Sequence, residues 1–413
     1  MIAVLGALDT KGAEFRYLIE CIRAGGHTPL VIDVGVMQEP AFAPDVPAHR
    51  VAEAGGGGLD VLRERADRGE AMRVMARGAA EVIRDLCARG DIAGIAGMGG
   101  SGGTAVFAEA VRSLPVGFPK VLVSTLASGE TSRIVGTKDL VLIPSVVDIA
   151  GLNRISRRII ANAAGAICGM VDARPADTPA DRPLIAASML GNTTPAVSAA
   201  REIFEAAGYE VLVFHAIGAG GRTMESLIAD GLIAGVFDIT TTELASELAG
   251  TPMSAGADRL RAAGNAGVPQ VIAPGCMDFA IFRRPETIPE RYAGRRLYPW
   301  NPETTLMRTT PEENAKLGRL LAERANAARG RLAILLPLRG LSIVGSEGQP
   351  FRWPEADDAL FDAIRLRLRP GIPLIEVDAH INDPAFARRA AETLLELLST
   401  PVPALAAHEG TGG

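Results

Sequence analysis

A run of glycines at residues 97–104 (GMGGSGGT) carries the clearest chemical signal in this 413-residue sequence. It separates a strand predicted at residues 92–98 from a helix predicted to begin at Thr104. Glycine lets backbone amides approach phosphate oxygens closely, and a helix N-terminus favours negative charge. The segment lacks the lysine of a P-loop and the acidic residue of a dinucleotide fingerprint, so a tight turn without a ligand is the alternative. The residues that we expect to bind a nucleotide here are Gly99, Gly100, Ser101, Gly102, Gly103 and Thr104.

Two other groups of polar residues follow predicted strands of the same half. The first strand, at residues 2–8, leads into Asp9, Thr10 and Lys11. A carboxylate such as Asp9 can hold hydrated magnesium, and a lysine can offset phosphate charge. Capping of the next helix by Asp9 and Thr10 is the alternative. After the strand at residues 120–124, the candidate ligand contacts are Ser124, Thr125, Ser128, Gly129, Glu130 and Thr131.

The second half of the sequence offers a second set of residues around its own strand ends. An arginine can bind a carboxylate or a phosphate with two parallel hydrogen bonds. Helix capping by threonines and weak surface ion pairs of arginines are the alternatives. Cys276 also follows a strand, but no paired base accompanies it in the sequence. The candidates for a second site are Gly191, Asn192, Gly220, Gly221, Arg222, Thr241 and Arg308.

The elements that position these residues alternate along the chain between short apolar runs and amphipathic helical patterns. This alternation is typical of βαβ units, and it predicts an α/β fold of two Rossmann-like, doubly wound domains with mainly parallel sheets. Periodicity is lost at residues 172–182. We therefore expect a nucleotide-binding domain at residues 1–175, a second domain at 182–400 and a flexible tail at 401–413.

Two stretches are predicted to be irregular, a Gly- and Pro-rich segment at residues 38–58 and a long loop at 278–308.

In open parallel sheets, ligands bind at the carboxyl ends of the strands. We therefore expect the two halves to enclose a cleft, into which Arg222 and Arg308 bring positive charge.

Composition excludes several classes of protein. A net charge of −6 argues against a basic nucleic-acid-binding face, and no apolar run is long enough to cross a membrane. The four cysteines stand apart without a C-x-x-C pair, which indicates a reducing, cytoplasmic environment.

Several motifs together resemble a known family along nearly the whole chain. They include GALDTKGAEF, GMGGSGGT, STLASGET, VFHAIGAGGRTME, DITTTELASEL and LMRTTPEENA. The chain resembles the ATP-binding domain family named after the tomato mosaic virus resistance protein. The resemblance implies two Rossmann-like domains, a homodimer, and magnesium-dependent ATP binding in the N-terminal half.

The predicted function is thus a magnesium-dependent ATP-binding protein. Two classes of activity remain open. One is an ATP-dependent enzyme that acts on a small carboxylate in the cleft between the domains, and the other is a non-catalytic nucleotide sensor or partner-binding module.

Overall fold

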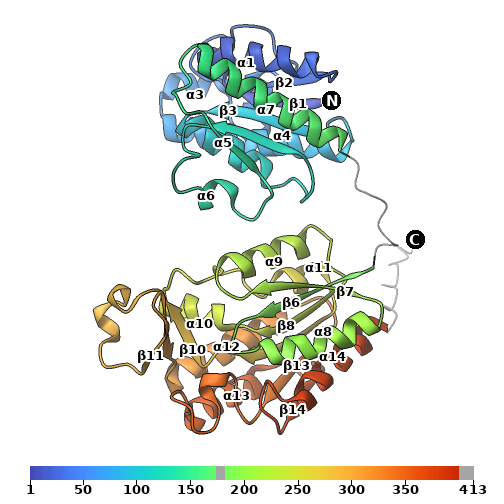
Figure 1. The fold of residues 1–413 in the computed structure, drawn as a ribbon, viewed down its shortest axis with the longest axis vertical. Coiled ribbons are helices and arrows are strands. Elements are labelled where there is room, and N and C mark those ends of the chain that lie inside the picture. Colours follow the sequence, from blue (N-terminus) through green and yellow to red (C-terminus); the bar gives the residue numbers. More distant parts are fainter. Residues whose placement is uncertain (174–181, 400–413) are drawn as a thin grey trace, which may run out of the picture. The chain divides into compact units, whose positions relative to one another are not determined.

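The computed structural model describes residues 1–173 and 182–399. The predicted tail at residues 401–413 lies outside them. The chain divides into two compact units, Met1–Thr178 and Pro179–Gly413, which are described one at a time (Figure 1). Both are α/β units built on a mainly parallel sheet, as predicted. Within the described residues, no helix has the length and apolar character needed to cross a membrane.

The N-terminal unit contains one five-stranded parallel sheet with the order β2-β1-β3-β4-β5. The chain therefore builds outward from β1 to β2, returns past β1, and continues on the other side with β3. This reversal leaves a switch point between the carboxyl ends of β1 and β3, the place where open α/β sheets bind ligands. The strands are β1 (Ile2–Gly6), β2 (Pro29–Asp33), β3 (Gly94–Gly99), β4 (Lys120–Ser124) and β5 (Val141–Pro144).

Alternating side chains of β1 serve the two faces of this sheet, because successive residues of a strand point to opposite sides. Ile2 and Val4 pack with α1 and α7, whereas Ala3 and Leu5 pack with α4 and α5. The helices of this unit are α1 (Leu8–Ala24), α2 (Ala48–Ala54), α3 (Leu59–Arg65), α4 (Arg68–Ala88), α5 (Ser101–Val111), α6 (Ser132–Val135) and α7 (Arg154–Asp172).

Two local predictions for the N-terminal unit are wrong. Helix α5 begins at Ser101 instead of Thr104, so two of the glycines form its first turn. The stretch at residues 38–58 is not irregular throughout, because it contains α2. Glycines at the crossing with α4 allow this short helix to pack: a Cβ at Gly78 would lie 1.8 Å from the carbonyl oxygen of Val51.

The C-terminal unit is built on a six-stranded parallel sheet with the order β14-β13-β9-β8-β6-β7. Taken in chain order, the first five strands of this sheet, β6, β7, β8, β9 and β13, repeat the arrangement of the N-terminal sheet. The switch point of this unit therefore lies between β6 and β8. The strands are β6 (Leu184–Met189), β7 (Glu210–His215), β8 (Gly235–Thr240), β9 (Gln270–Gly275), β13 (Leu332–Pro337) and β14 (Leu374–Val377).

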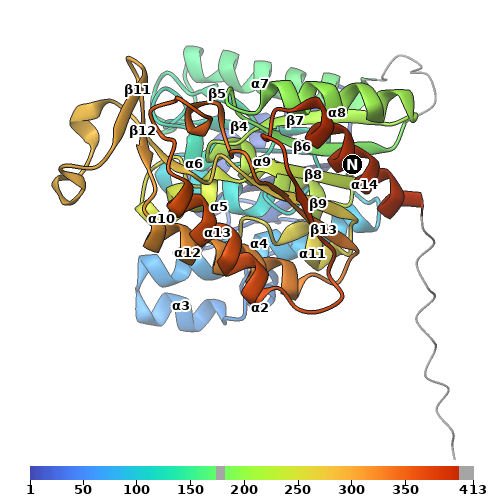
Figure 2. The ribbon, with the colours of Figure 1, turned by 90° about the horizontal axis from the view of Figure 1, so that it is seen from below.

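Helices cover both faces of this sheet. One face packs against α8 and α14, and the other packs against α9, α11 and α12, with α13 beside α12 (Figures 1 and 2). The helices are α8 (Thr194–Ala206), α9 (Ala219–Ala229), α10 (Thr242–Ala249), α11 (Ala262–Ala266), α12 (Pro311–Ala327), α13 (Pro354–Arg367) and α14 (Pro384–Ser399).

The loop predicted at residues 278–308 is instead a small antiparallel sheet with the order β10-β12-β11. Its strands are β10 (Phe279–Phe282), β11 (Leu297–Asn301) and β12 (Thr304–Arg308), and the pairing of β11 with β12 shifts between Pro299 and Asn301. Figure 2 shows the β11–β12 hairpin extending to one side of the unit. Buried side chains of β10 and β12 join the small sheet to the core of the unit. The prediction of an irregular loop did not include these buried side chains.

Candidate functional site

A cavity of about 580 Å³ lies at the switch point of the N-terminal unit. Its walls come from the segments after β1, β2 and β3 and from the beginning of α4. Of the residues predicted to bind a nucleotide, eight line this cavity, namely Asp9, Thr10, Lys11, Gly99, Gly100, Ser101, Gly102 and Gly103. Its volume is within the range of ordinary small-molecule sites, which run from roughly 300 to 1,000 Å³.

The glycines of the β3–α5 turn have different structural roles. A Cβ at Gly99 would lie 2.7 Å from the Cα of Gly103, so Gly99 is required for the turn itself. At Gly102 the nearest atom would be the Cε of Met72, at 3.3 Å, the far end of a flexible side chain. Gly102 therefore leaves space in the cavity, whereas Gly99 leaves space only for the backbone.

The first turn of α5 presents unused donors. Within the described residues, the amides of Ser101, Gly102 and Gly103 have no hydrogen-bond acceptor, and the N-cap residue Gly100 supplies no capping side chain. Such amides, at the positive end of the helix dipole, are suited to bind an anion.

Asp9 faces the segment after β2 and does not cap its own helix. Its Oδ2 accepts hydrogen bonds from the amides of Met37, at 3.0 Å, and Gln38, at 3.4 Å. Its Oδ1 is buried and has no hydrogen-bond partner. A carboxylate oxygen of this kind suits a magnesium ion, which prefers oxygen ligands and commonly keeps several of its waters.

Lys11 interrupts α1, where its backbone departs from helical geometry (φ −131°, ψ 29°). Its ammonium donates to the carbonyl oxygen of Ile149, in the segment that follows β5. An ammonium carries three donors. Lys11 can therefore keep this contact and still offset the charge of an anion in the cavity that it lines.

Several residues of the cavity were not predicted from the sequence. Helix α4 contributes Arg68, Met72 and Met75, and the segment after β2 contributes Met37. These side chains give the cavity a largely apolar wall beside the glycine turn. Nothing in the local pattern distinguishes them from ordinary residues of an amphipathic helix or a loop.

The remaining predicted residues of this half lie outside the cavity. The hydroxyls of Thr104 and Ser124 are buried and hydrogen-bond to each other at 2.7 Å, so neither is available to a ligand. The amide of Thr125 donates to the carbonyl oxygen of Gly99 at 3.2 Å. The other predicted contacts of this half lie in an exposed turn before α6, namely Ser128, Gly129, Glu130 and Thr131. In this turn, Glu130 accepts a hydrogen bond from the amide of Ser132 at 3.2 Å.

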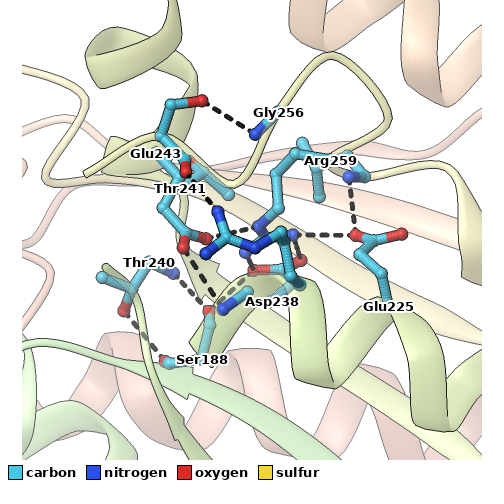
Figure 3. A network of polar contacts seen from close by, with 12 residues as sticks. Ser188, Glu225, Asp238, Thr240, Thr241, Glu243, Gly256 and Arg259 are labelled. Atoms are coloured by element: carbon cyan, nitrogen blue, oxygen red, sulfur yellow. Dashed lines mark hydrogen bonds and ion pairs between the residues drawn. The ribbon is translucent and has the colours of Figure 1, made fainter. Parts of the chain in front are cut away.

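The switch point of the C-terminal unit is filled by a buried polar network (Figure 3). Arg259 has no exposed surface at its guanidinium, which contacts the carboxylates of Asp238, Glu243 and Glu225. Its Nη2 donates to Asp238 Oδ1 at 2.7 Å, and its Nε donates to Glu243 Oε2 at 2.6 Å.

Electrostatics explain how this network can stay buried. Burial opposes the charge of Arg259, but the three carboxylates hold its pKa well above the ordinary value. Burial raises the pKa of Glu243, and Arg259 limits that increase. The three carboxylates outnumber the single guanidinium, and other donors complete the cluster: Glu225 accepts from backbone amides and Asp238 accepts from the Ser188 hydroxyl at 2.7 Å.

Four of the predicted second-site residues have structural contacts that explain them. A Cβ at Gly220 would lie 1.9 Å from the carbonyl oxygen of His215, and one at Gly221 would lie 2.1 Å from Glu243 Oε2. The hydroxyl of Thr241 donates to the carbonyl oxygen of Ala273 at 3.1 Å, and Asn192 Oδ1 accepts from the amide of Val344 at 3.2 Å. The glycines permit close packing, and the two polar side chains hold neighbouring segments together.

Gly191 and Arg222 lie at the surface of this unit. Gly191 approaches the indole of Trp300, to which its Cβ would lie 3.5 Å away. The Nη1 of Arg222 donates to the carbonyl oxygen of Ser254 at 2.9 Å.

Arg308 is buried, contrary to the expectation that it brings charge to an open cleft. All five N–H donors of a guanidinium have partners within its own unit, among them Asp357 Oδ1 at 2.6 Å and the carbonyl oxygen of Phe351 at 2.7 Å. No donor of Arg308 is left for a ligand, so Arg308 is not a candidate contact of a binding site. Asp357 is itself buried, and this burial raises its pKa to about 7.

Cys276 follows β9 in the left-handed backbone region (φ 58°) and is fully buried. Burial raises the pKa of its thiol well above the ordinary value. A thiol in this state is a poor nucleophile, because the thiolate is the reactive form. Among the described residues, no three histidine, cysteine or acidic side chains gather into a group that could hold a metal ion.

Comparison with known proteins relates both units to one family. Residues 1–176 match the N-terminal domain and residues 182–398 the C-terminal domain of the uncharacterised protein family UPF0261. A UPF0261 protein of Clostridium tetani is 45% identical over 398 residues, which cover 96% of this chain and 98% of that protein. A UPF0261 protein of Rhizobium meliloti is 46% identical over 391 residues, or 94% of this chain and 97% of that protein.

A plant relative is longer. The ToMV resistance protein Tm-1(GCR237) of Solanum lycopersicum is 36% identical over 416 aligned residues, which cover 95% of this chain but 55% of the tomato protein. This chain therefore spans about half the length of that relative. With both halves matched in order, the chain belongs to the protein family UPF0261.

Proposed function

We propose that the N-terminal unit binds ATP together with magnesium in the cavity at the β1–β3 switch point. The observation that carries this proposal is the first turn of α5, whose three unused amides line a cavity of nucleotide-compatible size. In this proposal, phosphate oxygens accept hydrogen bonds from Ser101, Gly102 and Gly103, as anions do at other helix N-termini.

Magnesium and phosphate charge would be held by residues that follow β1. The unpartnered Oδ1 of Asp9 would bind the ion directly or through a water, and Lys11 would offset negative charge. This assignment retains Asp9 as the candidate metal ligand.

Whether the bound nucleotide is turned over separates two forms of the proposal. One is an ATP-dependent enzyme for a small carboxylate, and the other is a nucleotide sensor. The occupation of both acidic residues of the cavity favours the sensor. Asp9 accepts from the amides after β2 through Oδ2 and is assigned to magnesium through Oδ1, and Asp67 caps α4 by accepting from Gly69 at 2.8 Å, so this proposal leaves neither as a general base.

The test is a calorimetric titration of the full chain with ATP, ADP and NAD, with and without magnesium. We expect ATP to bind and magnesium to increase its affinity. Gly102→Val should abolish binding without unfolding the unit, since a Cβ at this position has only the flexible ends of Met72 and Arg68 as neighbours. Gly165→Val is the matched control, because a Cβ at Gly165 in α7 contacts nothing within 4 Å.

Unchanged ATP affinity in Gly102→Val would show that the turn is structural and would contradict the proposal. Phosphate release from the bound ATP would identify the enzyme, and binding without turnover would identify the sensor.

A further inference from the structure

Two side chains of α4, one helical turn apart, face the glycine turn of α5. A Cβ placed on Gly102 would lie 3.3 Å from the Cε of Met72 and 3.7 Å from the Nη2 of Arg68. Both residues line the cavity. The space beside Gly102, where a Cβ would project, is therefore next to both a guanidinium and a thioether.

The charge of Arg68 is not neutralised by a neighbour. Within the described residues, its guanidinium has no hydrogen bond or ion pair, although acidic residues stand close by on the same helix. Glu70 pairs instead with Arg65 at 2.7 Å, and the Asp67 carboxylate accepts from the amides that begin α4. The exposed guanidinium therefore stands beside Gly102 without a counter-charge and can pair with an anionic ligand in the cavity.

Much of the cavity lining is apolar and rich in methionine. Unbranched thioether side chains adapt to the shape of a ligand, and sulfur makes favourable contacts with aromatic rings. The apolar lining consists of Val34, Val36, Met37, Leu62, Met72, Met75, Met98 and Val106. The cavity thus combines an anion-binding end with a wall suited to a flat ring.

We propose that Arg68 and Met72 recognise two different parts of one ligand, Arg68 its phosphate chain and Met72 its aromatic base. This inference rests on the proposed nucleotide function and assigns two specificity-determining residues to it. The ligand class is a phosphorylated compound with a flat, weakly polar ring, and neither half of such a ligand satisfies the cavity alone.

The experiment compares Arg68→Ala and Met72→Ala by calorimetry with three probes: ATP, adenosine and inorganic pyrophosphate. Arg68→Ala should weaken ATP and pyrophosphate about tenfold or more, since a charged hydrogen bond is worth roughly 1.5 kcal/mol or more, and leave adenosine unchanged. Met72→Ala should weaken ATP and adenosine by about three- to tenfold and leave pyrophosphate unchanged.

Two controls make the split specific. Arg73→Ala removes a charge from an exposed position of the same helix that does not line the cavity, and it should change none of the three affinities. Met72→Leu keeps the volume and apolar character of the side chain, and it should recover most of the adenosine affinity. Circular dichroism checks that each variant is folded.

The outcomes separate this inference from the function on which it rests. If the wild-type chain binds ATP but neither variant changes it, nucleotide binding stands and the recognition by Arg68 and Met72 is wrong. An Arg73→Ala loss equal to that of Arg68→Ala would also overturn it, because the effect would then be general electrostatics. If the wild-type chain binds none of the three probes, the proposed function itself fails.

Discussion

In each unit the chain reverses its direction across the sheet after the second strand, which creates a switch point between β1 and β3 in one and between β6 and β8 in the other. At the first, glycines and methionines surround a cavity with unused amides. At the second, Arg259 and three carboxylates are packed without exposed surface at the guanidinium. Strand order thus identifies where a site can form, and the residues after the strands decide whether one does.

The glycines near the two switch points also differ in their structural role. Gly102 and Gly221 both lie in glycine-rich segments that follow strands, and the sequence predicted Gly102 as a nucleotide contact and Gly221 as a candidate for a second site. In the structure, a Cβ at Gly102 would enter the cavity, whereas a Cβ at Gly221 would collide with the buried Glu243 carboxylate. One position is open for a ligand and the other is closed by the protein itself.

The largest expected effect is that of Arg259→Ala, which leaves the buried Asp238 and Glu243 without their counter-charge. Breaking a buried ion pair from one side typically costs about 3–5 kcal/mol. Urea unfolding followed by tryptophan fluorescence measures this loss of stability directly, because both tryptophans, Trp300 and Trp353, belong to the C-terminal unit.

The control for this prediction is Arg261→Ala, since this side chain is exposed and its Nε lies 3.7 Å from Asp258 Oδ1. Equal stability of the two variants would show that the network does not hold this unit together.

A smaller effect is expected when the two glycines are each replaced by alanine. Gly221→Ala should destabilise the C-terminal unit by about 1–3 kcal/mol, the usual cost of overpacking. Gly102→Ala should leave the stability of the N-terminal unit nearly unchanged, as measured by thermal unfolding in circular dichroism, and weaken ATP binding. A larger loss of stability in Gly102→Ala than in Gly221→Ala would contradict the difference described between the two units.

The pH dependence of stability tests the second buried cluster of the C-terminal unit. Burial raises the pKa of Asp357 to about 7, against an ordinary value of 3.8. Its contribution to stability is therefore fully present below about pH 4 and is lost as the pH rises through 7. Relative to Asp357→Asn, the wild-type chain should become less stable between pH 5 and pH 8 in tryptophan-detected unfolding. A pH-independent difference between the two proteins would argue against the raised pKa.

The smallest effect is predicted for Arg222→Ala. The side chain is exposed and makes one hydrogen bond, to the carbonyl oxygen of Ser254, so the change in unfolding free energy should stay within about 0.5 kcal/mol. ATP affinity, measured by calorimetry, should not change. A marked loss of affinity would instead support the sequence-based hypothesis that Arg222 belongs to the site.

The sequence predicted the parts of the site that lie directly after strands. Glycines, Asp9 and Lys11 follow apolar runs, and parallel strands bring such segments to one edge. Arg68 and Met72 were missed because they are ordinary residues of α4, which begins at Arg68, far along the chain from the first turn of α5 at Ser101. Their role depends on how α4 packs, which no local pattern records.

Similar reasoning explains the errors in the fold. Helix α2 is seven residues long, with Pro47 before it and a run of glycines after it, so its helical periodicity is too short to recognise. The antiparallel sheet at residues 279–308 is built from strands of four or five residues, one of which contains Pro299. Arg308 was interpreted as an exposed charge, because the sequence does not show that distant carbonyl groups and Asp357 satisfy it.

Strand β11 has a further consequence for the behaviour of the chain at high concentration. It forms an edge of the small sheet and carries Leu297 and Trp300, both about two-fifths exposed. Unpaired apolar edges of this kind are templates on which other chains add strands and aggregate. Pro299 removes one N–H from the middle of β11, and the register shift beside it disturbs the regular spacing of the remaining groups. The irregularity that hid this strand in the sequence thus also makes it a poor starting point for fibre growth.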